Sequence, residues 1–438
     1  MLLEFRAKNY KSFKDELLFS LVPAPKQKGL SYSVLSEKIG KTTYKGLCSA
    51  VIYGPNAAGK TNIIGAMDAF KSIVLSGHIR NDNDKHTPNA AASKLELIPN
   101  SANQDQEPVQ FSIKFTTGKF LIEYKFACAL GNFMETDFPR RIVSEALFVN
   151  NMMIFDRQEG LTIGDLTPIK PLLVNAFDKT VSEAISAGNL NDEELFLMNG
   201  FKAMFSAKLV SIITSWLNDK FVVIYRANFM RLTRESSNFT KESVYIENTL
   251  NDAAVCFGIN SNALGYVVEE DGGNAKLCSL FQKDSNVLAL PAELFESYGT
   301  IRFVNIFPLV VRVLLDGGTL VVDEFDASIH PMALMSIVNI FHNDDINRNH
   351  AQLIFNTHNP IFLNSNLFRR DEIKFVERDD ETHYSTHYSL SDFGTAGEKG
   401  VRMNDDYMKN YFISHYGAIK NIDFTPVLEK LLKQESEV

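Results

Sequence analysis

The sequence predicts an α/β protein with a mostly parallel, three-layer core, to which an antiparallel β subdomain and a mainly helical insertion are added. From residue 291 onward, short apolar runs of the kind found in buried strands alternate with helical patterns. Strands that alternate with helices usually pair in parallel, with helices on both faces of the sheet. Near the N-terminus, a buried-strand pattern at 46–54 leads through a glycine-rich turn into a helix at 61–77.

The N-terminal part of the chain, residues 1–165, is expected to form one lobe. Two strands are predicted within 1–22, before the strand and helix just described. The segment 78–108 is rich in Asn, Asp, Ala and Pro, and we expect most of it to be a mobile surface loop. After it, alternating apolar and polar residues from 109 to 157 predict an antiparallel meander.

The remainder of the 438 residues divides at about residue 290. Residues 166–290 are expected to be a mostly helical insertion or lid, with two strand-like runs. Residues 291–438 are expected to form a C-terminal lobe. The elements predicted there are a helix, a strand at 319–324, a helix from Pro331, a strand at 351–358, a further helix, and strands at 372–378 and 387–391.

Composition is that of a globular protein, with 45% hydrophobic and 22% charged residues. The net charge of -9 disfavours sequence-independent DNA binding by the whole surface, because phosphate contacts require clustered Lys and Arg. The cysteines show no Cys-x-x-Cys pair and no histidine at ligand spacing, so we expect reduced thiols and no zinc site. They are Cys48, Cys128, Cys256 and Cys278.

Neither the N-terminus nor the most apolar segment resembles a membrane-targeting element. Charged residues begin at Glu4, unlike in a secretory signal. The most apolar helical pattern, 301–315, contains two arginines and is too short to cross a bilayer. We therefore expect a cytoplasmic protein that does not bind a membrane.

The segment GPNAAGKT, residues 54–61, fits the pattern G-x-x-x-x-G-K-[ST]. A buried strand precedes it and a helix follows it, which is the context that a phosphate-binding loop requires. Backbone N–H groups of such a loop surround phosphate oxygens, Lys60 contributes a positive charge, and Thr61 can ligate Mg²⁺. A glycine-rich turn without a ligand is the alternative interpretation.

Two acidic residues end the apolar strand TLVV, at Asp323 and Glu324. In a protein with a P-loop, the first would hold the Mg²⁺ shell, and the second is placed to orient or deprotonate the attacking water. A single acid after a strand could be a helix cap, but a pair at the end of a second buried strand favours catalysis. His358 follows another buried strand, where it could reach the γ-phosphate.

The segment ESYGT, residues 296–300, is typical of a helix start, because Ser297 can cap the helix and Gly299 can turn. The order of P-loop, Ser-x-Gly, apolar-Asp-Glu and His resembles that of the ABC-type ATPases of the SMC/RecF group. It differs from AAA+ machines, which have a sensor region and an arginine finger, and from GTPases, which have Asn-Lys-x-Asp.

Three further segments strengthen this resemblance, which covers roughly residues 1–150 and 290–420. FRAKNYKSF, residues 5–13, resembles the N-terminal strand of the group, and DEFDASIHP, residues 323–331, resembles its Walker B motif and D-loop. YMKNYFISHYGAI, residues 407–419, is similar to a C-terminal element of ATPases found in bacterial phage-defence and toxin–antitoxin loci.

The resemblance implies ATP and Mg²⁺ as ligands. Thr61 and Asp323 would hold the metal, Glu324 would be the catalytic base, and His358 would be the switch histidine. Asp326 would lie in the D-loop across a dimer, and Ser297 and Gly299 would be the signature residues. The residues expected to contact the nucleotide are Gly54, Pro55, Asn56, Ala57, Ala58, Gly59, Lys60, Thr61, Asn62, Ser297, Gly299 and Asp326.

The sequence departs from the family pattern in two places. The signature is reduced to ESYGT, and the candidate for the Q-loop glutamine, Gln110, is better interpreted as an exposed strand residue. Residues 9–12 could border the nucleotide or belong to an edge strand.

The function implied is an ATP-switched homodimer, or a larger assembly, in which each ATP lies between Lys60 of one chain and Ser297 of the other. Its output would be a phage-defence response exerted through a partner, a nuclease or toxin encoded nearby. Dimer formation would then be part of the active site.

Two alternatives remain open. A RecF-like DNA-repair ATPase would bind DNA, and the arginines and aromatics of residues 225–234 are the best sequence indication of it. We prefer to interpret this run as a strand whose arginines pair with nearby acids. An ATPase-linked nuclease of the overcoming-lysogenization-defect type would need a Toprim domain, which FVERDDE, residues 375–381, suggests. Only a short stretch follows that segment, so we interpret residues 377–381 as a strand end and a solvated turn.

Overall fold

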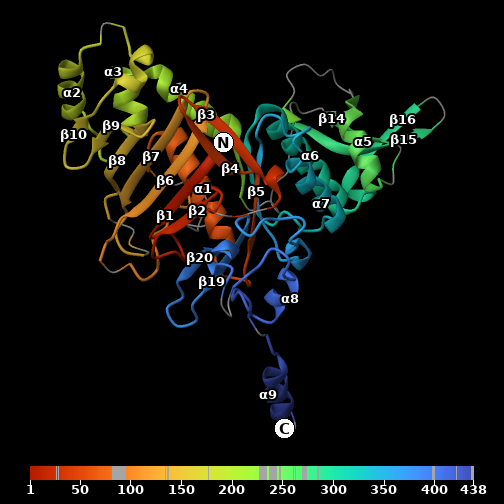
Figure 1. The fold of residues 1–438 in the computed structure, drawn as a ribbon. Helices are drawn as coiled ribbons and strands as arrows, with labels where there is room; N and C mark the ends of the chain where they lie inside the picture. Colours follow the sequence, from red (N-terminus) through yellow and green to blue (C-terminus); the bar gives the residue numbers. More distant parts are fainter. Residues whose placement is uncertain are drawn as a thin grey trace.

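The computed structural model of the chain describes all residues except 26, 28, 81–94, 104, 134, 136–137, 176, 226–233, 236–243, 246–247, 260, 262, 269–273, 284–285, 397–399, 421 and 436–438. Within the described residues, a six-stranded sheet has the order β11-β17-β18-β5-β19-β20. Three of its strands, β5, β19 and β20, are labelled in Figure 1. Neighbouring strands of this sheet run parallel, apart from the antiparallel pair β19 and β20. These strands are β11 (Phe221–Ile224), β17 (Thr319–Val322), β18 (Gln352–Asn356), β5 (Ser49–Tyr53), β19 (Ile373–Arg378) and β20 (Ser385–Ser389).

Helices cover both faces of this sheet. On one face, Ala50 and Ile52 of β5 belong to the apolar cluster that contains α1. On the other, Val51 and Tyr53 belong to the cluster that contains α6 and α7. Successive side chains of a strand point to opposite faces, so this central strand is buried along its whole length, as its continuous apolar sequence predicts. The helices are α1 (Lys60–Ser76), α6 (Tyr298–Asp316) and α7 (Pro331–Phe341).

A second sheet is antiparallel and has the order β10-β9-β8-β7-β6-β1-β2. Helix α1 packs against it, since Phe70 stacks on Phe126 with ring centroids 5.4 Å apart and meets Phe5 edge-on at 5.9 Å. The same helix therefore supports two sheets. The strands are β1 (Leu2–Lys8), β2 (Leu17–Ser20), β6 (Val109–Thr117), β7 (Phe120–Ala129), β8 (Arg141–Val149), β9 (Met152–Arg157) and β10 (Leu161–Ile163).

The prediction of a mainly helical segment from 166 to 290 is correct only for its first part. That part contains α2 (Lys179–Gly188), α3 (Lys202–Met204) and α4 (Ala207–Ser215), and it ends in β11, which is a strand of the parallel sheet. Trp216 stacks on Phe115 of β6 at 3.8 Å, so this part is packed into the N-terminal lobe.

The second part of the segment is largely strand. A third sheet has the order β12-β15-β14-β13, and β16 also pairs with β15. Two of its strands have two residues each, and polar residues separate the longer ones, so the alternation gave only one strand signal, at 264–271. The elements are β12 (Arg234–Glu235), β13 (Val244–Tyr245), α5 (Asn248–Phe257), β14 (Ala263–Val268), β15 (Asn274–Lys283) and β16 (Asn286–Pro291).

Two smaller predictions also differ from the structure. The helix expected after His358 is only a short 3₁₀ turn, Pro360–Phe362, with a proline at its start. Of the loop expected at 78–108, residues 81–94 lie outside the described residues, while Leu97 and Asn100 are buried and thus packed. The remaining elements are β3 (Val34–Ile39), β4 (Thr42–Leu47), α8 (Tyr407–Phe412) and α9 (Thr425–Glu435).

Helix α6 is, among the described residues, the one helix that is long and apolar enough to cross a membrane by length and composition. It is also a core helix of this fold. Val304, Ile306 and Val310 are buried in the cluster beside the parallel sheet. Arg302, on the same helix, is buried and donates to the backbone carbonyl of Glu324. Its apolar character is therefore explained by packing against the sheet.

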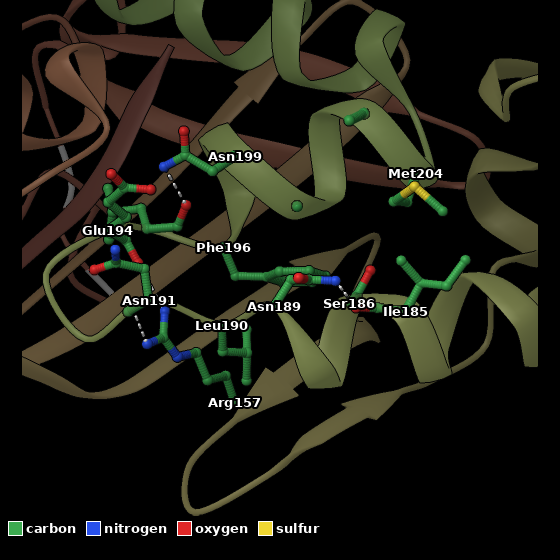
Figure 2. Close-up of a pocket in the computed structure, with 13 residues that line it drawn as sticks. Arg157, Ile185, Ser186, Asn189, Leu190, Asn191, Glu194, Phe196, Asn199 and Met204 are labelled. Carbon is green, nitrogen blue, oxygen red and sulfur yellow. Dashed lines mark hydrogen bonds between the residues drawn. The ribbon is translucent and has the colours of Figure 1, made fainter.

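A buried ion pair joins β8 and β9 to the segment before α3. Arg157 and Glu145 approach to 3.6 Å, and their side chains are 4% and 0% exposed. Arg157 also donates to the carbonyls of Glu194 and Asn191 at 2.7 and 2.5 Å, and it lines a cavity of about 200 Å³ (Figure 2). Glu145 in turn accepts from the backbone N–H of Phe196 at 2.6 Å.

Replacing Arg157 by Met is expected to lower the free energy of unfolding of this lobe by about 3–5 kcal/mol, because Glu145 would be left buried without its cation. Lys114→Met is the matched control, since Lys114 and Glu123 form a partly exposed pair at 3.3 Å in the same sheet. That control should cost less than about 1 kcal/mol. Urea unfolding followed by Trp216 fluorescence measures both, and equal costs would contradict the prediction.

Candidate nucleotide-binding site

Residues 54–59 connect the end of β5 to the start of α1, as the P-loop pattern predicts. The ammonium of Lys60 donates to the carbonyl oxygens of Gly54 at 2.8 Å and Pro55 at 3.0 Å. Burial lowers the pKa of Lys60 to about 8, although the carboxylates of Asp323 and Glu324 act to raise it. The loop therefore holds a cation in a partly desolvated position at the helix N-terminus, where anions bind favourably.

Close packing behind the loop requires glycine at position 59. Its φ is 111°, and a Cβ atom there would lie 2.7 Å from the hydroxyls of both Ser12 and Ser385. Asn62 donates to Ser12 Oγ at 2.8 Å, and Ser385 donates to the Ala58 carbonyl at 2.5 Å. Ser12 thus supports the P-loop from behind, and Ser385 is a supporting residue that the sequence patterns did not indicate.

The carboxylate of Asp323 lies beside the P-loop at the end of β17. Its Oδ1 accepts from Thr61 Oγ1 at 3.1 Å and from Asn356 Nδ2 at 2.6 Å. Because β17, β18 and β5 are adjacent and parallel, their carboxyl ends bring these three side chains together. A threonine hydroxyl and a carboxylate are oxygen ligands of the kind that Mg²⁺ prefers, so the residues present fit that ion.

Glu324 has an unusual backbone conformation, which two neighbours hold. Its φ is 49°, a left-handed value that costs a non-glycine residue of order 1–3 kcal/mol. Its N–H donates to Asn356 Oδ1, and its carbonyl accepts from Arg302. Asn356 and Arg302 are therefore site residues that sequence reasoning missed. Arg302 could have been found from the sequence, because it is a charged residue within the apolar pattern of 301–315.

His358 and Asp326 lie close enough to the site to interact with it electrostatically. The pKa of His358 is lowered first by partial burial and then by the Lys60 charge, while Asp326 and Glu324 act to raise it. His358 is exposed two residues beyond the end of β18. Of the other predicted contact residues, Asn56 and Ala57 are exposed on the outer side of the loop.

Ser297 is the N-cap of α6, as its position predicts. Its Oγ accepts from the Thr300 N–H at 3.1 Å, and the residue is exposed. Gly299 is buried against the loop that follows Asp326, where a Cβ atom would lie 2.1 Å from the Ser328 carbonyl oxygen. In the part of the chain that the structure describes, no hydrogen bond joins Ser297 or Gly299 to residues 54–62.

The remaining sequence candidates do not join the site. Gln110 is an exposed residue of β6. Asp379 Oδ1 accepts from the N–H groups of Glu381 and Thr382 at 3.1 and 2.7 Å, so the acidic segment after β19 is a local turn at the surface, as we interpreted it. Residues 226–233 of the arginine-containing run lie outside the described residues.

A buried polar cluster lies at the opposite, amino end of β5. Ligand atoms of Cys48, His342 and Glu372 lie within 4.8 Å of one another, although no sequence spacing indicates it. Glu372 accepts from Ser49 Oγ at 2.7 Å and from the Arg369 N–H at 2.8 Å, and His342 Nε2 lies 3.2 Å from it. Protein groups therefore satisfy this carboxylate, and we interpret the cluster as a structural hydrogen-bond network.

Residues 214–364 match the family model described as an AbiEii toxin-type AAA domain of a type IV toxin–antitoxin system. No curated protein matches the chain. A solved SMC head bound to the C-winged helix domain of ScpA is similar at 12% identity and a TM-score of 0.41, covering 89% of this chain and 99% of that one. The SMC head domain from Thermotoga maritima is similar at 11% identity and a TM-score of 0.34, covering 89% and 98%.

The matched segment contains α6, the acidic end of β17 and His358, and it begins well after the P-loop. The motifs on either side of it meet in space, because Thr61 of the P-loop contacts Asp323 within the matched segment. With its P-loop, its Asp-Glu pair and this matched segment, the chain is similar to ATPases that contain an AAA domain of the AbiEii toxin type.

Proposed function

We propose that the protein binds and hydrolyses ATP as a sandwich homodimer, or as a larger assembly built from such dimers. The observation that carries the proposal is the separation of two groups of motif residues. Lys60, Thr61, Asp323 and Glu324 are assembled around one P-loop, whereas Ser297 caps a helix and, among the described residues, makes no hydrogen bond to that loop. A second copy could supply the missing serine.

Thr61 and Asp323 would hold Mg²⁺, which supplies charge neutralisation at the phosphates when bound. Lys60 binds phosphate oxygens through its ammonium. Glu324 orients the attacking water and accepts its proton, and His358 interacts with the γ-phosphate from the next strand. Asn356 and Arg302 are positioning residues, because they hold Asp323 and the backbone of Glu324.

The biological output that we propose is phage defence in the cytoplasm, exerted through an effector such as a nuclease or toxin. The toxin–antitoxin description of the matched family supports it, together with the similarity of residues 407–419 to a C-terminal element of defence ATPases. Closing of the dimer on ATP would be the switch, since a ligand shifts a conformational equilibrium by its differential affinity for the two states.

Co-expression of two inactive chains tests the sandwich. Lys60→Ala removes the phosphate cation, and Ser297→Arg blocks the signature, so each variant alone should lose at least about a hundredfold in ATP hydrolysis. A mixed dimer, isolated by two different tags, keeps one intact composite site and should recover up to about half of the wild-type rate. Glu293→Arg, an exposed change near the signature, is the control and should remain active. A mixed dimer as inactive as its parents would refute the arrangement.

ATP affinity should fall as pH rises above 8. Burial lowers the pKa of Lys60 to about 8 without nucleotide, and binding of phosphate favours the charged ammonium and raises that pKa. Binding is therefore strongest below pH 8, and it weakens up to tenfold per unit above it, with proton uptake. Calorimetry at pH 8.5 in buffers of different ionisation enthalpy measures the uptake. Lys60→Ala should bind more weakly and show no such uptake, and pH-independent binding by the wild type would contradict the prediction.

Asn356→Ala is expected to raise the Mg²⁺ concentration that half-saturates ATP hydrolysis and to lower the maximal rate by about 10–100-fold, as changes in residues that hold metal ligands do. The reason is that Asp323 Oδ1 and the Glu324 N–H both lose a partner. Asn349→Ala, in the loop before β18, is the control, since Asn349 bonds only to carbonyls at the end of α6. A Mg²⁺ titration of the hydrolysis rate distinguishes the two, and an unchanged half-saturation in Asn356→Ala would contradict the assigned role.

A further inference from the structure

The last helix, α9, stands away from the rest of the chain (Figure 1). Phe424, Val427, Leu428 and Leu432 are 69%, 58%, 57% and 66% exposed. Every residue from 422 to 430 is exposed, so none of these side chains is buried against the body of the protein.

The exposed apolar residues of α9 lie on one face. Positions 424, 427, 428 and 432 follow the spacing i, i+3, i+4 and i+8, which places side chains on a single stripe of a helix. Glu429 and Lys430 lie on the other side. This is the pattern of a helix that buries one face against a partner.

A helix of this length does not persist in water without such a partner. α9 spans 11 residues, and isolated helices shorter than about 12–15 residues are marginal even in favourable sequences. Its N-terminal turn has local support, because Asp423 accepts from the Thr425 N–H at 2.9 Å. The stabilisation that is still required is burial of the apolar stripe.

The charges on the helix favour a second copy of the chain over a membrane. A helix that lies on a bilayer surface is rich in Lys and Arg on its polar face, whereas α9 carries as many acids, Glu429 and Glu435, as bases, Lys430 and Lys433. Adjacent charges of opposite sign at the middle of a helix are self-complementary in a two-fold arrangement, where each acid can face the other copy's base.

The apolar area is also sufficient for a stable pair. Helix α8, which precedes α9, exposes Met408 and Phe412 by 41% and 58%, and Ile413, directly after it, is 65% exposed. Each large apolar side chain removes on the order of 100 Å² from water when it is covered. The apolar side chains of α8, of α9 and of the residues between them thus offer roughly 800 Å² per chain, which is what each partner contributes to a standard stable interface.

We propose that two copies of this protein associate through α9 and the adjacent exposed face of α8, and that this contact forms without nucleotide. It is separate from the ATP sandwich, because it uses neither the P-loop nor Ser297. It gives the assembly a constitutive contact, so that ATP acts on chains that are already joined.

Mass measurement of the full chain without nucleotide tests this contact. Light scattering behind gel filtration at about 1–50 μM should give twice the chain mass of 49.2 kDa for the wild type. The double substitution Leu428→Glu/Leu432→Glu should give the mass of a single chain, because it places charges in the stripe. Lys430→Glu changes the net charge by the same amount on the polar side and should remain dimeric.

Two results would overturn the proposal. The first is a single-chain mass for the wild type without nucleotide. If that protein then sediments with anionic vesicles, a lipid surface and not a second copy covers α9. A double variant that stays dimeric would remove α9 from the contact. Circular dichroism and ATP binding establish that the variants are folded. Neither result bears on the ATP sandwich, which the mixed-dimer experiment tests independently.

Discussion

The carboxylate of Asp323 is the contact on which the site depends. It receives Thr61 from the P-loop helix and Asn356 from the neighbouring strand, and so ties together the carboxyl ends of three parallel strands. Loops that follow parallel strands meet at one edge of a sheet. The hydrogen bonds of Thr61 and Asn356 to Asp323 then fix the positions of these loops relative to one another, as precise alignment of reacting groups requires. The residues of 54–62 and 323–326 are therefore one unit, although more than 250 positions separate them.

Helix α1 gives this unit its rigidity. It begins with Lys60, and its other side is buried against the antiparallel sheet through Phe70. The P-loop is consequently held between two sheets, with Ser12 and Ser385 filling the space behind Gly59. An element that packs on both sides cannot shift without disturbing both cores, which are as dense as organic crystals. Residue 59 is therefore a glycine, because neither sheet can move to make room for a methyl group there.

Local patterns in the sequence carried most of the fold and the centre of the site. Continuous apolar runs predicted β5, β17 and β18, and the glycine spacing predicted the P-loop, because both signals are contained in a few adjacent residues. Asn356, Arg302 and Ser385 were not predicted, since their roles arise only when distant strands become neighbours. Of the strands after residue 262, β14 was predicted in part, whereas β15 and β16 were missed, because β-strand preference depends on the cross-strand partner more than on the strand itself.

Arg302 connects the N-terminal end of α6, where Ser297 lies, to the backbone of Glu324. The helix starts at Ser297, which is exposed toward solvent, and five residues later Arg302 holds the carbonyl of Glu324 in its left-handed conformation. A helix is stiff over this distance, so Arg302 links the N-terminal end of α6 to the Glu324 backbone. Gly299 adds a second tie, because it packs directly on the Ser328 carbonyl in the loop after Asp326. Whatever contacts Ser297 therefore acts on the geometry of Glu324 through one turn and a half of rigid helix.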